Sequence, residues 1–148
     1  MSRISGKCFD FQLGDLSIHA EKFTCDIEDG GEVAKTKGIP VGWLEGPVGA
    51  SGEIELDTTN LSLVLEAARS AGSFHALSTF DIVAYAKAGD EEKRVEIFGC
   101  RLRVSKLLDV DSNSATKDVT TLPYDVTSPD FVRVNGVPYL DARETEGL

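Results

Sequence analysis

The chain is poor in the residues on which metal binding, redox chemistry and covalent cross-linking usually depend. Its 148 residues include two histidines, three cysteines, one tryptophan and one methionine. No apolar run approaches the ~20 residues needed to span a bilayer, which predicts no membrane insertion. The first seven residues lack the apolar core of a secretory signal, so we expect a protein made and kept in a cytoplasm-like compartment.

The cysteines predict no disulfide. Cys8, Cys25 and Cys100 are odd in number and widely spaced, and each lies in an apolar, strand-like segment. Free cysteine in such a segment behaves as a small buried hydrophobe. We therefore expect reduced thiols packed in the core of the protein.

No motif predicts a bound metal or another cofactor. His19 and His75 are far apart, and the sequence has no His-x-His, Cys-x-x-Cys or His-Glu-x-x-His spacing. Residues 109–113 begin like a calcium-binding loop, but Ser114 stands where that loop needs glycine and Thr120 where it needs glutamate. We interpret this segment as a polar turn.

An enzymatic function is also disfavoured. Residues 114–117 match a Ser-x-x-Lys nucleophile pattern, but so short a match arises easily by chance and its companion motifs are absent. The glycine pairs lack the Lys-Ser or Lys-Thr of a phosphate-binding loop. Spacing alone leaves a catalytic pair of carboxylates open, since acidic residues are plentiful. The sequence contains no specific motif for catalysis and predicts a protein that is not an enzyme.

Acidic residues outnumber basic residues by 25 to 15, which gives a net charge of −10. Proteins that bind nucleic acid cluster lysine and arginine to displace counterions from the phosphates. This chain has no basic block, so we expect no specific binding of DNA. A surface that repels DNA is compatible with the same charge.

Alternating polar and apolar residues predict an antiparallel β-protein. The Gly-Asp pair at 14–15 and the Asn-Gly pair at 135–136 are typical of hairpin turns, and a charged four-residue turn is expected at 89–92. Gly99 predicts a bulge, and Pro123 favours an edge or bulge position. The predicted strands cover residues 7–13, 16–27, 50–57, 80–88, 94–108, 115–127 and 132–140.

One helix is predicted between the third and fourth of these strands. Residues 58–60 offer an N-cap, and Gly72 is placed to end the helix. The apolar residues between them recur with helical spacing: Leu61, Val64, Leu65 and Ala68. The predicted fold is mainly β, an antiparallel sandwich or barrel with one short α-helix packed on it. We expect a single domain over residues 1–140 and a polar, flexible tail over residues 141–148.

Residues 29–49 break the alternating pattern and predict a long loop. The segment is rich in glycine, yet it also contains a set of apolar residues: Val33, Ile39, Val41, Trp43 and Leu44. Long loops in compact domains are usually functional or disordered, and apolar side chains on such a loop need a surface to cover them. We predict that these five residues contact another subunit. The alternative is that the loop folds back over its own core.

Three acidic residues, Glu53, Glu55 and Asp57, share one face of a predicted strand. Such a face is usually simply solvated. It is also a candidate for a surface that repels DNA, because its carboxylates have the same charge sign as the phosphates.

The order of these features, together with particular segments, resembles a known family. The segments are Asp26–Gly30, Ala50–Thr58, Leu65–Gly72, Phe98–Cys100 and Phe131–Leu140. The chain is similar to the tail tube subunits of contractile-tailed bacteriophages, and more specifically to a family of short tail proteins from temperate phages of that type. The resemblance covers nearly the whole chain, and its elements are structural rather than catalytic.

The resemblance implies a structural virion protein that is made in the host cytoplasm. Tube proteins form hexameric rings that stack into a hollow cylinder inside a contractile sheath, and their fold is related to the ring protein of type VI systems. The strands of each subunit would join an intersubunit barrel around the lumen. From their charge, Glu53, Glu55 and Asp57 are candidates for the lining of that lumen. Implied partners are further copies of the chain and the sheath, tape-measure and baseplate proteins, with DNA passing through unbound.

Two alternatives stay open at this point. One is a tail terminator or baseplate adaptor of the same fold, which would form one ring rather than an unlimited tube. The other is a small ligand-binding β-barrel, for which the glycine-rich segment would form a lid over an apolar cavity.

Overall fold

The computed structural model describes residues 3–108, 112–113, 115 and 117–148. The segment that begins like a calcium-binding loop and the Ser-x-x-Lys match lie largely outside the described residues. The described chain is mainly antiparallel β, as predicted, with a single α-helix. Its elements are η1 (Gly6–Cys8), β1 (Phe9–Leu13), β2 (Leu16–Ile18), β3 (Lys22–Phe23), β4 (Asp26–Asp29), β5 (Glu32–Thr36), β6 (Ile39–Leu44), β7 (Val48–Asp57), α1 (Thr58–Ala71), β8 (Phe80–Ala88), β9 (Glu91–Leu102), β10 (Val119–Val126), β11 (Val132–Val134) and β12 (Val137–Pro138).

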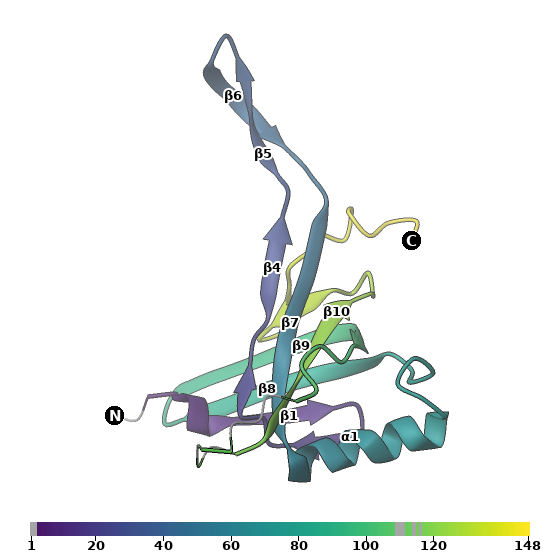
Figure 1. Cartoon of the computed structure of the whole chain (residues 1–148). Coiled ribbons are helices and arrows are strands. Elements are labelled where there is room, and N and C mark those ends of the chain that lie inside the picture. Colours follow the sequence, from purple (N-terminus) through teal and green to yellow (C-terminus); the bar gives the residue numbers. More distant parts are fainter. Residues whose placement is uncertain (1–2, 109–111, 114, 116) are drawn as a thin grey trace.

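One sheet forms the body of the protein, with its main strands in the order β2-β1-β8-β9-β10-β7-β3. Strand β4 continues the pairing along β7, and the β11–β12 hairpin pairs with β9. The sheet curls, so β8 and β9 cross behind β7 and β10 (Figure 1). Its two ends meet where the rings of Phe11 on β1 and Phe23 on β3 stack with centroids 4.7 Å apart. The result is the predicted sandwich-like body around one core.

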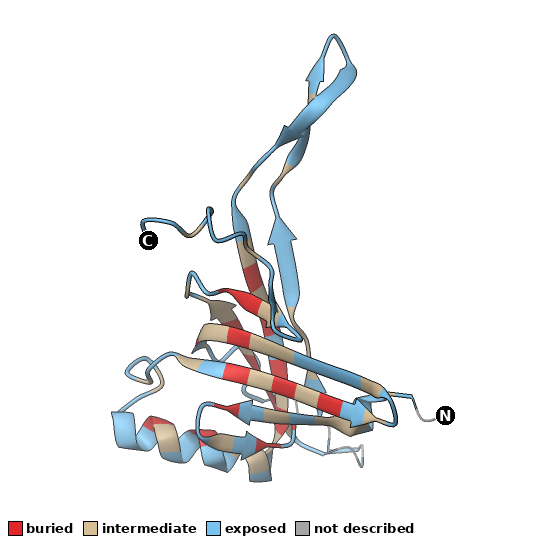
Figure 2. Cartoon of the chain, turned by 180° about the vertical axis from the view of Figure 1, so that it is seen from behind, coloured by how far each residue is buried: buried red, intermediate tan, exposed pale blue. Residues whose placement is uncertain are grey.

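Strand β7 shows how the sequence pattern builds this core. Ile54 and Leu56 have no exposed surface, whereas Glu53, the residue before Ile54, is exposed and Glu55 between them is half-buried. Successive side chains of a strand point to opposite faces, so the alternation fixes which face is buried. Buried residues therefore line the inner face of the crossing strands (Figure 2).

Helix α1 closes one end of the body, with Val64 and Ala68 turned toward the sheet. Gly72 ends the helix in the left-handed conformation (φ 105°), and its N–H donates to the carbonyls of Ala68 and Arg69. The predicted helix end is therefore confirmed. The N-cap is Asp57, one residue before the predicted cap segment.

Three strand features refine the sequence prediction. The turn between β8 and β9 is Gly89–Asp90, shorter than expected, and β9 ends at Leu102 rather than continuing to residue 108. The bulge at Gly99 is confirmed by its φ of 63° and by a shift of register opposite Phe80–Ile82. The final hairpin turns through Asn135 and Gly136, both with positive φ, as the Asn-Gly pair predicts.

Pro123 does not lie on an edge strand, which was one of the two positions expected for it. Its strand, β10, lies between β7 and β9. The ladder from β10 to β9 begins only at Tyr124, so the missing N–H of Pro123 falls just beyond its end. The carbonyl of Pro123 accepts a hydrogen bond from the backbone N–H of Arg103 at 2.8 Å. An interior strand tolerates proline here because no ladder bond is lost.

Residues 29–49 are not an irregular loop. Strands β5 and β6 form a two-stranded hairpin that projects far from the body as a continuation of β4 and β7 (Figure 1). Lys37 and Gly38, with φ of 54° and 78°, form its tight turn. We call residues 32–44 the arm. The sequence pattern missed these strands because the arm has no buried face to impose an alternation.

Replacing Ile54 with alanine tests the assigned core. The change removes a fully buried side chain beneath the crossing strands, and we expect the free energy of unfolding to fall by about 2–5 kcal/mol. Urea denaturation of the variant and of a Glu53→Ala control measures the difference. Equal effects of both substitutions would contradict the assigned faces of β7.

Candidate assembly surface

The arm exposes all five of the apolar residues selected from the sequence. Val33, Ile39, Val41, Trp43 and Leu44 have exposed fractions between 47% and 64%. Val33 and Trp43 are cross-strand partners, so their side chains share one face of the hairpin. The alternative that this segment folds back over its own core is therefore wrong, and so is a lid over a cavity of the same chain.

The root of the arm is held by specific contacts with the body. The N–H of Gly30 donates to the carbonyl of Pro47 at 2.8 Å. Asp29 accepts hydrogen bonds from the N–H of Gly31 at 2.9 Å and from the hydroxyl of Tyr139 at 2.8 Å. These two bonds lower the pKa of Asp29, so the carboxylate stays ionised.

The glycines at the root of the arm allow the two segments of the hairpin to approach each other closely. A Cβ at Gly31 would overlap the indole ring of Trp43, and a Cβ at Gly46 would overlap the carbonyl of Gly30. Glycine allows the strands to pass at this distance because it has no side chain. Tight packing therefore accounts for the glycines at the root of the hairpin, Gly30, Gly31 and Gly46, and not for the other glycines of this segment.

The body presents open strand edges, of which those of β2 and β4 matter most for assembly. Strand β2 pairs with β1 alone, and β4 pairs with β7 alone, among the strands of the described chain. All four residues of β4 are exposed. Open edges offer unpaired backbone groups to a further strand, and proteins that assemble often complete them with a neighbouring subunit.

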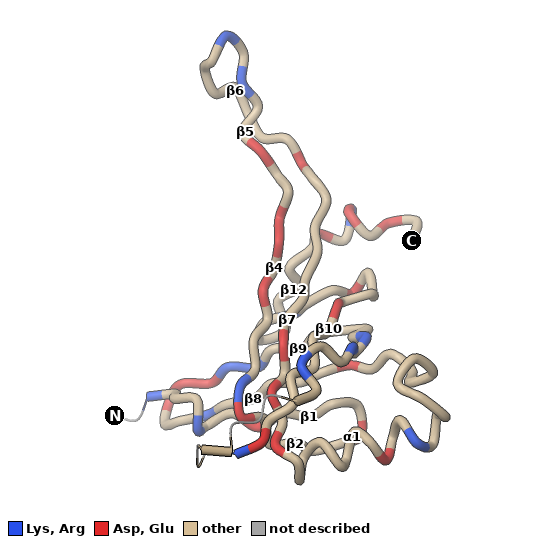
Figure 3. Tube along the Cα trace, in the orientation of Figure 1, with Lys and Arg blue, Asp and Glu red and all other residues tan. Residues whose placement is uncertain are grey.

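The three candidate acidic residues have different surroundings, although alternation places all of them on the outer face of β7. Glu53 is exposed, and Glu55 and Asp57 are half-buried. Lysines and carboxylates both occur across the body, with several acidic residues along β4 and β7 (Figure 3). Of the three, Asp57 has a structural role of its own.

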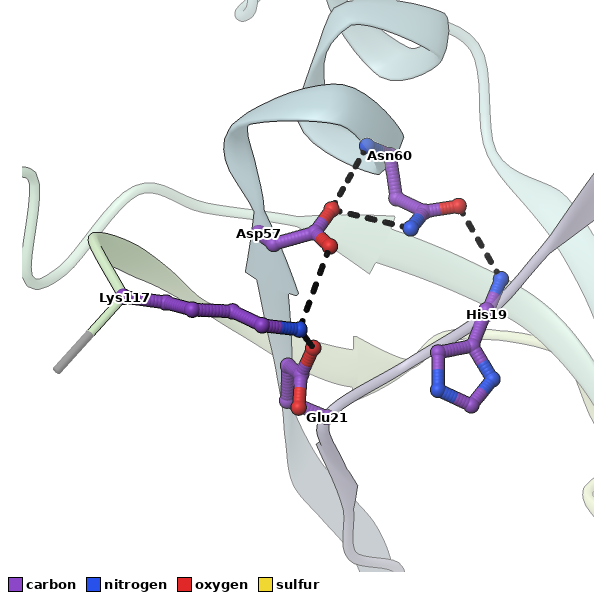
Figure 4. Close-up of polar contacts among 5 residues, drawn as sticks. All are labelled: His19, Glu21, Asp57, Asn60 and Lys117. Carbon is purple, nitrogen blue, oxygen red and sulfur yellow. Dashed lines mark hydrogen bonds and ion pairs between the residues drawn. The ribbon is translucent and has the colours of Figure 1, made fainter. Parts of the chain in front are cut away.

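Asp57 caps helix α1 and ties it to distant segments (Figure 4). Its Oδ1 accepts hydrogen bonds from the N–H and Nδ2 of Asn60 at 2.8 and 2.9 Å. Its other oxygen lies 3.9 Å from the Nζ of Lys117, which also pairs with Glu21 at 2.8 Å. The oxygen of the Asn60 side chain in turn accepts the N–H of His19 at 3.1 Å. The bonds from Asn60, helped by Lys117, lower the pKa of Asp57.

The cysteines and histidines form no site in the part of the chain that the structure describes. Cys100 is buried in the core, where desolvation raises its pKa to about 12. Cys25 is half-buried between β3 and β4, and Cys8 lies in η1 rather than in a strand as expected. No group of three or more potential metal ligands is found among the described residues.

No helix in the described chain combines the length and the apolar character needed to cross a membrane.

Replacing Asp57 tests the capping role. We expect Asp57→Ala to lower the melting temperature by several degrees, because the backbone N–H and the side-chain Nδ2 of Asn60 lose their acceptor. Asn is also a good N-cap, so Asp57→Asn should lose less stability and should separate the cap from the ion pair with Lys117.

The same pair of variants shows a distinct pH dependence. Because folding lowers the pKa of Asp57, its carboxylate stabilises the fold above the unfolded pKa, and this contribution is lost as pH falls through the folded pKa. Thermal unfolding from neutral to acidic pH should therefore show a smaller loss of stability in Asp57→Asn than in the parent protein. An identical acid profile in both would contradict the assigned role.

The family comparison gives this fold a context. The family model of the bacteriophage HP1 Orf24 protein matches residues 7–140. A candidate tail tube protein of Haemophilus phage HP1 (strain HP1c1) is 45% identical over 148 residues, which cover 100% of this chain and 99% of the relative.

Solved structures with a similar fold come from contractile injection systems. The sheath/tube terminator of the PVC system in its extended state matches with a TM-score of 0.68 at 13% identity, over 90% of this chain and 97% of that chain. The PVC sheath-tube complex matches with a TM-score of 0.66 at 13% identity, over 89% and 90%. The tube terminating cap of the anti-feeding prophage gives 0.67 at 14% identity, over 90% and 91%.

At such low identity these structures show a shared fold alone, whereas the match to the HP1 proteins extends along the sequence itself. The family model covers most of the chain, and the HP1 relative aligns from end to end. The chain belongs to the bacteriophage HP1 Orf24 family of phage tail tube proteins.

Proposed function

We propose that copies of this chain assemble into hexameric rings, which stack as a hollow tail tube inside a sheath and conduct DNA during ejection. The observation that carries this proposal is the projecting arm with five exposed apolar side chains. A monomer would leave this surface in water, whereas a neighbouring copy would cover it. The full-length HP1 relative and the folds of injection-system tube components support the same role.

Head-to-tail assembly follows from the shape of the chain. The arm and the body are different surfaces, so a contact between them is heterologous and closes into a ring or continues as a filament. Pairing of the open edges of β2 and β4 with neighbouring subunits would continue the sheet around the lumen as an intersubunit barrel. Burial of apolar side chains supplies the main driving force for such association.

We further propose that the outer face of β7 lines the lumen. Glu53 and Glu55 would present carboxylates to passing DNA, and Asp57 would contribute to the same field from the end of the strand. Like charge prevents phosphates from forming the counterion-releasing contacts that hold DNA on a protein. The net charge of −10 per subunit supports a conduit that DNA crosses without binding.

The proposed role is structural, with no chemistry and no cofactor. The partners would be further copies of the chain and the sheath, tape-measure and baseplate proteins, within a virion. A tail terminator is a second candidate, because the terminator of the PVC system shares this fold as closely as the tube does. Long tubes in negative-stain micrographs of purified protein would support the tube role, discrete rings would support the terminator, and monomers would contradict both.

Replacing Trp43 with serine tests the arm. We expect the protein concentration needed for assembly to rise about tenfold or more, since tryptophans at the centre of interfaces often carry much of the binding energy. Sedimentation of assembled material and negative-stain microscopy measure the change. The control is Leu65→Ser on α1, another exposed apolar residue. Assembly that responds equally to both changes would contradict a specific role for the arm.

Reversing the charge of the β7 face tests the lumen assignment. We expect virions that carry Glu53→Lys and Glu55→Lys subunits to eject DNA more slowly, because lysines in the lumen would bind phosphates. Ejection triggered in vitro can be followed by the fluorescence of a DNA-binding dye. Glu66→Lys on the exposed surface of α1 is the control. Ejection at the parental rate in the double variant would contradict the lumenal position.

A further inference from the structure

A second apolar surface of the body lies between the two ends of the curled sheet. It is a groove of about 350 Å³ lined by Phe9 and Phe11 of β1, Phe23 and Cys25 near β3, Ile27 of β4 and Val134 of β11. Ile27 and Val134 are exposed, and the three aromatic rings are half-buried. The groove is therefore a solvent-facing extension of the core.

Aromatic stacking gives the groove a fixed shape. The rings of Phe9 and Phe11 have centroids 6.1 Å apart, and Phe23 continues the row to Tyr124 at 5.7 Å. Tyr124 is fully buried and donates its hydroxyl to the carbonyl of Thr24 at 2.6 Å. One end of the row is thus anchored in the core while the other end faces water, so the groove is preformed for an apolar partner.

We propose that this groove receives the arm of a second copy of the chain. The inference rests on the proposed tube function and names the surface that the arm contacts. The chain carries an apolar projection and an apolar groove, and each lacks a partner within the described chain. The arm leaves the body at the far end of β4, pointing away from it, so it does not reach the groove of its own molecule (Figure 1).

Charge complementarity supports the arm as the occupant. The arm contains Glu32, Lys35 and Lys37, which give it a net charge of +1 and leave −11 for the rest of the chain. Both lysines lie at the tip, which is the basic end of the projection (Figure 3). Strand β4 lines the groove through Ile27, and its acidic residues Asp26, Glu28 and Asp29 are exposed beside the groove, whereas Lys93 is the one cation among the lining residues. An arm lying along β4 would place opposite charges side by side.

Cross-linking provides a direct test, because Cys25 already lies in the groove. A Val41→Cys substitution adds a thiol to the arm, in a Cys8→Ser background that removes the other partly exposed thiol. The assembled protein is oxidised with a copper catalyst in air and examined by denaturing, non-reducing electrophoresis. We expect a ladder that extends beyond the dimer, since every subunit would carry both an arm thiol and a groove thiol.

The ladder should disappear when Cys25→Ser is added, and a Leu65→Cys control should not produce it. Tubes or rings that form normally but give no Cys25-dependent ladder would overturn the groove proposal and leave the tube function intact. Monomers in micrographs of the parental protein would overturn both.

A matched pair of substitutions adds a second measurement. Ile27 in the groove wall and Leu65 on α1 are each 36% exposed. We expect Ile27→Asp to raise the concentration needed for assembly about tenfold or more, because the arm would lose an apolar contact and meet a new charge near its face. Leu65→Asp should change it little, with circular dichroism confirming that both variants are folded. Equal effects would overturn the proposal.

Discussion

Strand β7 is the element on which the rest of the structure depends, because it is hydrogen bonded along both edges. Strand β10 pairs with one edge, and β3 and β4 pair with the other. Its alternation places Ile54 and Leu56 in the core and the carboxylates outside. A shift of one residue would exchange these faces, so burial and register enforce each other. The same strand leads into the arm, whose direction is therefore set by the body.

The contact around Gly52 of β7 shows how tightly this register is held. A Cβ at this position would overlap the carbonyl of Thr24 and approach the hydroxyl of Tyr124. Without a side chain at Gly52, Tyr124 reaches across β7 and donates to Thr24 on the neighbouring segment. This bond joins the crossing strands beneath the aromatic row. The groove and the core thus share one set of contacts.

The chain uses its apolar residues in two ways. One set closes the core of the body, and a second set stays in water on the arm and in the groove. A surface of this kind is costly for a protein that works alone but useful for one that assembles. In the proposed assembly, negative charge on the body would limit indiscriminate association, and the basic tip of the arm would favour one orientation. Assembly would then be both strong and directional.

Local chemistry determined much of this protein from the sequence alone. The Asn135-Gly136 turn, the helix end at Gly72 and the bulge at Gly99 each need a backbone conformation that glycine or asparagine adopts readily, so neighbouring residues suffice to predict them. The apolar residues of the arm were also found from the sequence, because their composition does not suit a solvated loop. Their contact with a second subunit is still a prediction.

Only the tertiary structure decided the features that join distant segments. The arm is a hairpin whose two strands pair with each other. Because neither strand buries a face, the sequence shows no alternation of polar and apolar residues from which the strands could be predicted. Asp57 caps the helix within a network of hydrogen bonds and ion pairs that includes His19 and Lys117. The groove combines β1, β4 and β11, which lie far apart along the chain. Such contacts depend on the path of the whole sheet, and no short stretch of sequence contains that information.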